Sequence, residues 1–192
     1  MKLDWKKYAT YQLPDFPFGE LARTLDIQEV EHGLETLKSQ LQVRQDKLQE
    51  LVRPAGILLD GSDKEIIKLN ELFSGKAERQ PGADHMTFAW GEFCLDVGVY
   101  LGETIRKMHP KLSWDVLERG DPEHPEYHDI GLIYANELYV TVDVFNSIFM
   151  YAQSVLDNDL LWPALWSENF LLIVQQTDAR MRGEDPFEWM RG

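Results

Sequence analysis

The segment DIGLIYANELYVTVDVF, residues 129–145, decides the fold class of this chain. Apolar side chains recur at every second position along it, at Ile130, Leu132, Tyr134, Val140, Val142 and Val144. This period is typical of strands that bury one face. Asn136 and Glu137 interrupt the pattern as turn residues do, so we predict two strands, over 129–135 and 138–145.

A third strand precedes this pair. Residues 112–117 alternate around Trp114, and the proline-containing stretch 120–127 links them to the strand that follows. Consecutive strands with short links usually form an antiparallel meander. The sequence therefore predicts a three-stranded antiparallel sheet over about 112–145.

The strongest helical pattern lies directly before the sheet, over residues 86–108. Apolar residues recur there in steps of three and four, at Met86, Trp90, Phe93, Val97, Leu101, Ile105 and Met108. Gly98 and Gly102 lie beside this stripe. Because glycine disfavours a helix interior, we expect another backbone to press against them, with Val140, Val142 and Val144 packed there.

Two helices are expected after the sheet. Asn146 and Ser147 are good N-caps for a helix that ends near residue 157, and Pro163 suits the first turn of a last helix, which extends to Gly183.

The N-terminal part predicts an aromatic arm over 1–25 and then two helices. Asp26 and Glu29 have capping-box spacing before a helix over 27–52, and a second capping box opens a helix over 62–75. We interpret these two helices as a hairpin.

The fold class is therefore α+β, mainly helical, in a single domain of residues 1–192. Pro81 and Gly82 favour a boundary between an arm and helical hairpin, 1–80, and a helix–meander–helix core, 84–192.

The helix 27–52 also allows an intermolecular interpretation. Its apolar residues have nearly heptad spacing, at Ile27, Val30, Leu34, Leu37, Leu41, Leu48 and Leu51. Gly33 and Arg44 interrupt a continuous coiled-coil seam. Two interpretations of helix 27–52 therefore remain open: it packs inside the domain, or it forms the interface of a homodimer.

Charge is the most unusual bulk property. The chain has 33 acids and 19 Lys or Arg, and ten acids but no Lys or Arg lie between Arg119 and Arg180. Such a surface repels nucleic acid and anionic membranes, and it attracts a basic protein. Solubility is the alternative explanation. For partner binding we single out five acids in this stretch: Glu123, Glu126, Asp129, Glu137 and Asp143.

No recognisable catalytic motif is present, and we expect no cofactor. His124 and His128, with their acidic neighbours, are the best metal candidates, but Pro125 indicates a loop where a helical face would be needed. The acids Glu92, Asp96 and Glu103 have helical spacing, and we assign them to the polar outer face of an amphipathic helix. The lone cysteine, Cys94, is expected to be a small buried hydrophobe.

The N-terminus lacks a signal-peptide pattern and no apolar run is long enough to span a bilayer, so the expected location is cytoplasmic.

Residues 94–151 resemble a group of uncharacterised bacterial domains. The likeness rests on DVGVYLGE at 96–103, which matches their GxYLGE-like helix, on the strand around Trp114, and on VDVFNS at 142–147 before a helix. The resemblance implies a helix-plus-meander fold in bacteria. Because some small acidic bacterial proteins are immunity partners of toxins, it also favours an immunity-like function.

The sequence thus leads to three hypotheses. The first is a non-enzymatic binding or inhibitory protein that acts on a basic protein partner. The second is a structural or assembly protein that dimerises through helix 27–52. The third is a metal-dependent enzyme that uses His124 and His128.

Overall fold

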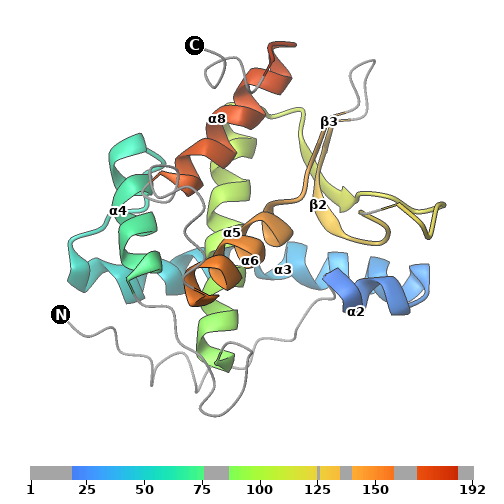
Figure 1. Cartoon of the computed structure of the whole chain (residues 1–192), viewed down its shortest axis with the longest axis horizontal. Coiled ribbons are helices and arrows are strands. Elements are labelled where there is room, and N and C mark those ends of the chain that lie inside the picture. The colour runs from blue at the N-terminus through green and yellow to red at the C-terminus, as the bar shows by residue number, and fades with distance from the viewer. Residues whose placement is uncertain (1–18, 76–86, 125, 135–139, 158–167, 186–192) are drawn as a thin grey trace.

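The computed structural model describes residues 19–75, 87–124, 126–134, 140–157 and 168–185 (Figure 1). The elements in chain order are α2 (Gly19–Thr24), α3 (Ile27–Val52), the 3-10 helix η1 (Arg53–Ala55), α4 (Asp63–Ser74), α5 (Phe88–Met108), β1 (Ser113–Val116), β2 (Ile130–Tyr134), β3 (Val140–Val142), α6 (Val144–Asp157) and α8 (Asn169–Met181). Most of these residues are helical, and the strands form one small sheet, so the predicted α+β, mainly helical class is confirmed.

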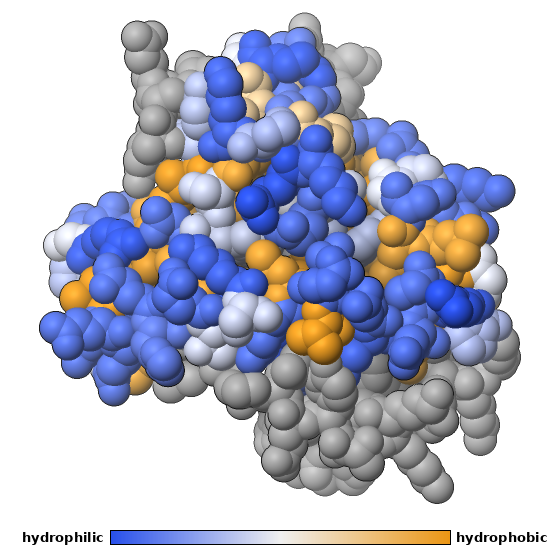
Figure 2. Space-filling model, turned by 180° about the vertical axis from the view of Figure 1, so that it is seen from behind, coloured by the Kyte–Doolittle hydropathy of each residue, from blue (hydrophilic) through white to orange (hydrophobic). Residues whose placement is uncertain are grey.

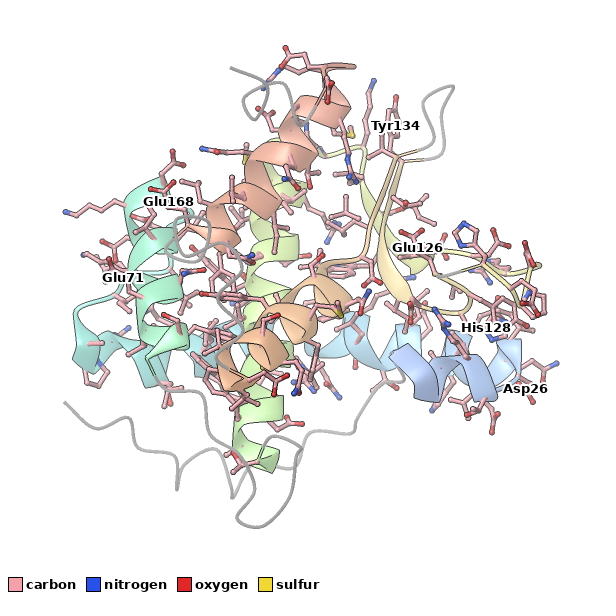
Figure 3. The ribbon with its side chains drawn as sticks, viewed as in Figure 1. Asp26, Glu71, Glu126, His128, Tyr134 and Glu168 are labelled. Atoms are coloured by element: carbon pink, nitrogen blue, oxygen red, sulfur yellow. The ribbon has the colours of Figure 1, made fainter. Side chains whose placement is uncertain are left out.

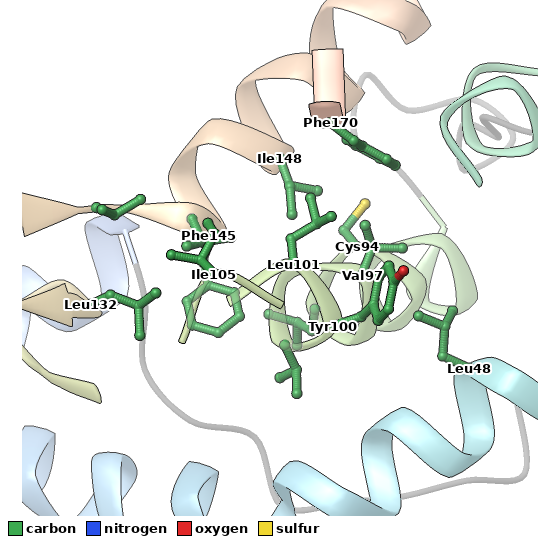
Figure 4. Packing of buried hydrophobic residues seen from close by; sticks show 14 of the residues in the cluster. Leu48, Cys94, Val97, Tyr100, Leu101, Ile105, Leu132, Phe145, Ile148 and Phe170 are labelled. Atoms are coloured by element: carbon green, nitrogen blue, oxygen red, sulfur yellow. The ribbon is translucent and has the colours of Figure 1, made fainter. Parts of the chain in front are cut away.

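Helix α5 is the central element of the core (Figure 1). It begins at Phe88, where the Thr87 side chain accepts a hydrogen bond from Trp90 N, and the residues from Glu92 to Gly102 are all buried. Helix α3 packs on one side of it, and α6 and α8 pack on others. Figure 4 shows α5 side chains between Leu48 of α3 and Phe145 and Ile148 of α6. Because neighbours surround α5, its polar residues Glu92, Asp96 and Thr104 are buried too.

Two glycines of α5 receive aromatic rings. A Cβ atom at Gly98 would lie 2.5 Å from Phe145 Cδ1, and one at Gly102 would lie 2.4 Å from Trp114 Cζ2. The expectation of close approach holds, but the neighbour is wrong. Aromatic side chains press against these glycines, whereas a backbone and the strand valines were predicted to do so.

The sheet is an antiparallel meander in the order β1-β2-β3. Trp114 lies opposite Leu132, which lies opposite Val142, so these three side chains share one face of the sheet. The third strand is shorter than predicted, because Val144 and Phe145 already belong to α6. Residues 135–139 lie outside the described residues.

The predicted start of α3 is confirmed. Glu29 N donates to Asp26 Oδ1 at 2.9 Å, and Asp26 N donates to Glu29 Oε2 at 3.1 Å, which is the reciprocal capping box. The box predicted for α4 does not form, because Ser62 makes no side-chain cap. Glu65 turns away to accept a hydrogen bond from Leu58 N at 2.7 Å.

The two helices of the expected hairpin follow one another but pack on different partners. Helix α3 lies against α5 and β1, whereas α4 lies against α8. Asn70 of α4 is fully buried, and it accepts a hydrogen bond from Phe170 N of α8 at 3.1 Å. The apolar stripe of α3, including Leu37 and Leu48, is buried within the chain.

Several expectations fall outside the described residues: the arm before residue 19, the boundary at Pro81 and Gly82, and the helix start at Pro163. No helix in the described ranges has the length and apolar character that crossing a membrane requires. Figure 2 shows a mainly hydrophilic rear face, on which hydrophobic residues form separate groups.

Candidate functional site

The five acids proposed for partner binding do not form one exposed patch. Glu123 is exposed and Glu126 is half-buried, whereas Asp129 is only 3% exposed and the Asp143 carboxylate is largely buried. Glu137 lies outside the described residues. Asp129 and Asp143 therefore do not share an exposed surface with Glu123.

Asp143 is the N-terminal cap of α6. Its Oδ1 accepts a hydrogen bond from Asn146 N at 2.9 Å, and its backbone carbonyl accepts one from Ser147 Oγ at 2.7 Å. The sequence suggested Asn146 and Ser147 as caps, but the helix begins two residues earlier. The alternation of apolar and polar residues in β3 continues through Asp143, so the pattern predicted that Asp143 is an outward-facing strand residue.

Asp143, Asp129 and Glu126 form a cluster of carboxylates. Burial raises the pKa of Asp143 to about 7, against the opposing effect of the Asn146 N–H. The charges of Asp129 and Glu126 raise it further, as does the Asp143–Asp129 side-chain contact. The second Asp143 oxygen, Oδ2, is buried and accepts no hydrogen bond from the described residues. Burial and the two neighbouring acids thus all oppose the ionisation of Asp143.

A pocket of about 310 Å³ opens beside this cluster, where β3, the start of α6 and one face of α8 meet. Its walls are Glu126, Thr141, Val142, Asp143, Asn146, Ser147, Ile173, Gln176, Thr177 and Arg180. Only two of these ten residues are aliphatic. Glu126 belongs to the 118–128 loop and lies beside the sheet (Figure 3). Thr141 Oγ1 donates to Glu126 Oε1 at 3.4 Å.

No sequence pattern groups these pocket residues, because they come from three elements and a loop. One signal was available. Arg180 is the first base after a sixty-residue stretch without Lys or Arg. A cation so isolated in sequence points to a specific local environment, and the fold places it at the wall of the acid-lined pocket.

The loop 118–128 is closed by backbone bonds that leave its acids at the surface. His128 N donates to Glu118 O, and Leu117 N donates to Asp129 O, each at 2.8 Å. His128 adopts the left-handed conformation, with φ of 60°. Backbone N–H groups of Gly120 and, more weakly, Asp121 lower the pKa of Glu118.

The two histidines of this loop have structural contacts. His128 is 3% exposed, its Nδ1 lies 3.2 Å from Leu25 O, and its ring stacks on Tyr127. His124 Nδ1 accepts a hydrogen bond from Glu126 N at 3.1 Å. In the described parts of the chain, no three His, Cys, Asp or Glu side chains are grouped so that they could hold a metal ion.

The loop lies against the start of α3. Arg119 joins the two segments, with Nη1 at 2.7 Å from Glu31 Oε1 and Nη2 at 2.6 Å from Asp115 Oδ1. We define the acidic face by its exposed carboxylates on both segments: Asp26, Glu29, Glu31, Glu35, Asp121 and Glu123. Figure 3 shows Asp26 and the 118–128 loop on the same side of the molecule.

A second set of buried charges lies between α3 and α5. Arg44 is fully buried, with Nη1 at 2.7 Å from Asp96 Oδ1 and 3.6 Å from Glu92 Oε2. Arg44 Nε also donates to Gln40 Oε1 at 2.9 Å. Assigning Glu92 and Asp96 to an outer face was wrong. The signal was Arg44 itself, a base in an apolar stripe that required buried acids opposite it.

The remaining predicted acid of α5, Glu103, is also engaged. It accepts hydrogen bonds from Trp114 Nε1 at 2.7 Å and from Arg106 Nη1 at 2.6 Å. Cys94 is fully buried, as predicted, and burial raises the pKa of its thiol. A thiol of this kind is a packing residue rather than a nucleophile.

Comparison with known proteins gives no assignment: no family model, no curated protein and no solved structure matches this chain.

Proposed function

We propose that this protein binds a basic protein partner through the acidic face formed by the 118–124 loop and the first turns of α3. The observation that carries the proposal is the position of Arg119. This base lies between the two segments, and Glu31 and Asp115 neutralise it. Glu35 pairs with Lys38 at 3.0 Å, and the remaining acids of the face form no ion pair with the Lys and Arg side chains of the described residues: Asp26, Glu29, Asp121 and Glu123.

The charges of this face suit fast, long-range attraction. The lowered pKa of Glu118 keeps that carboxylate ionised at neutral pH. The net charge of the whole chain is −14, which adds to the local field. Exposed charges are screened beyond about 8 Å at physiological ionic strength. Partner association should therefore be rapid at low salt and slow steeply as salt is added.

The alternatives have less support. An assembly function through α3 needs a free apolar stripe, and that stripe packs on α5. A metal-dependent function needs ligands at His124 and His128, whose ring nitrogens Nδ1 already face hydrogen-bonding groups of the chain.

Two variants of equal charge test the proposal. Glu35→Lys/Glu123→Lys alters the acidic face, and Glu50→Lys/Glu71→Lys alters exposed acids of α3 and α4 outside it. Each changes the net charge from −14 by +4 to −10. Association with an immobilised lysine-rich basic protein is measured by surface plasmon resonance at several salt concentrations.

We expect the face variant to lower the association rate about tenfold at low salt and the control variant to lower it about twofold or less. Circular dichroism of both variants should match the parent protein, because exposed charges contribute little to stability. If both variants slow association equally, the attraction depends on net charge alone and the acidic face is not a docking site.

A further inference from the structure

The pocket beside Asp143 has a different character from the acidic face. Its cavity, about 310 Å³, is at the small end of the range of ligand sites in proteins. Thr141, Ser147 and Thr177 contribute hydroxyl groups to its lining, and Asn146 and Gln176 contribute amides. A cavity of this size and polarity suits a small, strongly polar molecule.

Opposite charges line this single cavity. Asp143 and Glu126 supply carboxylates to the lining, and the Asp143 side chain also contacts that of Asp129. Arg180 of α8 lines the same pocket, and its exposed side chain makes no hydrogen bond or ion pair with the described residues. The pocket thus has carboxylates and a guanidinium group in one lining.

The neighbouring charges of α8 are used elsewhere. Asp178 faces away from the cavity, toward His109 Nε2 at 3.0 Å and toward Arg182. Arg182 also pairs with Glu184 at 2.7 Å. Arg180 is therefore the residue of this helix that can pair with an anion in the pocket.

We propose that this pocket binds a small zwitterion that carries an ammonium group and a carboxylate, the chemistry of a free α-amino acid. The ammonium group donates to Asp143 and Glu126, and the carboxylate accepts from Arg180. Charge-assisted hydrogen bonds of this kind are stronger than neutral ones. The hydroxyl and amide groups of the wall hold the remainder of the ligand.

The ligand and Asp143 affect one another. An ammonium group beside the carboxylate would favour its ionised form and lower the pKa of Asp143 from about 7. The charged groups around this carboxylate are Asp129 at the start of β2, Glu126 of the loop and Arg180 of α8. The two acids oppose the ionisation of Asp143. Binding should consequently strengthen between pH 6 and pH 8.

Calorimetric titration of the full chain with each common α-amino acid in turn tests the proposal. Two variants remove one charge each, Asp143→Asn and Arg180→Gln. Asparagine is a good N-cap, so the first variant keeps the start of α6. Arg53→Gln, at the exposed end of α3, is the matched control. We expect at least one amino acid to bind, about tenfold or more weakly in each pocket variant and equally well in the control.

Three outcomes would overturn the inference. One is that no amino acid binds. Another is that binding persists unchanged in Arg180→Gln and a simple alkylamine binds equally well, which would make the pocket a cation site only. The third is equal loss in the Arg53→Gln control. Because the acidic-face variants leave every pocket residue unchanged, failure here is distinguishable from failure of the proposed docking function.

Discussion

Two groups of buried carboxylates in this protein have opposite surroundings. Asp96 and Glu92 of α5 lie deep in the core, where Arg44 of α3 contacts both carboxylates. Asp143 and Asp129 lie at the edge of the core, where burial and mutual repulsion raise the pKa of Asp143 to about 7. Both groups are removed from water, but Arg44 contacts the acids of the first, whereas neighbouring acids raise the pKa of Asp143 in the second.

The two groups of carboxylates differ in what they can do for the protein. A buried ion pair has already compensated its charges, so it fixes how α3 and α5 pack and offers nothing to a ligand. Asp143 instead lines a pocket, and burial together with two neighbouring acids raises its pKa, so its ionised form costs folding free energy. This residue is therefore the one on which our proposed ligand site depends.

The largest expected effect comes from breaking the paired group. Arg44→Met removes the guanidinium group that contacts Asp96 and Glu92 and leaves Lys47, whose pKa burial lowers to about 8, as the cation near them. We expect the free energy of unfolding to fall by about 4 kcal/mol. Urea denaturation measures this loss. The double variant Arg44→Met/Asp96→Leu should recover part of it. A single variant as stable as the parent would mean that the pair is not essential to the core.

The next effect comes from neutralising the Asp143 carboxylate. The folded pKa of Asp143, about 7, exceeds its ordinary value of 3.8, so the folded state binds more protons between these values. Its ionisation therefore costs stability progressively as pH rises from about 4 to 7. Asp143→Asn should stabilise the protein by about 3 kcal/mol at pH 8 and hardly at all at pH 4.

Denaturation midpoints across this pH range check the sign, and Asp157→Asn at the exposed end of α6 is the control. A stabilisation that is the same at pH 4 and pH 8 would contradict the role assigned to the Asp143 charge.

A smaller effect distinguishes the two sides of α5. Gly98→Ala places a methyl group 2.5 Å from the Phe145 ring, two residues after Asp143, and should destabilise the protein by about 2 kcal/mol. In contrast, Gly91→Ala meets nothing within 4 Å, and it should stabilise the helix by up to about 1 kcal/mol. Thermal denaturation compares the two. Equal shifts would show that α6 does not pack tightly on α5.

Sequence reasoning succeeded where local chemistry decides the outcome. The capping box of Asp26 and Glu29 and the alternation of β1 and β2 involve residues close in the chain, so their patterns could be interpreted directly. It failed where distant segments decide burial. Asp96 looked exposed because its partner Arg44 lies 52 residues earlier. Asp143 looked like a surface residue because the alternation of β3 does not reveal that α8 lies beside it.

The buried Asn70 has a consequence for the order in which the chain becomes folded on the ribosome. Its side-chain oxygen accepts a hydrogen bond from the backbone N–H of Phe170, which lies 100 residues later in the chain. At about 5–20 residues per second, α4 is synthesised roughly 5–20 s before that donor exists. Throughout this interval the apolar side of α4 has no final neighbour in α8. Nascent-chain folding should consequently finish only after α8 emerges from the ribosome.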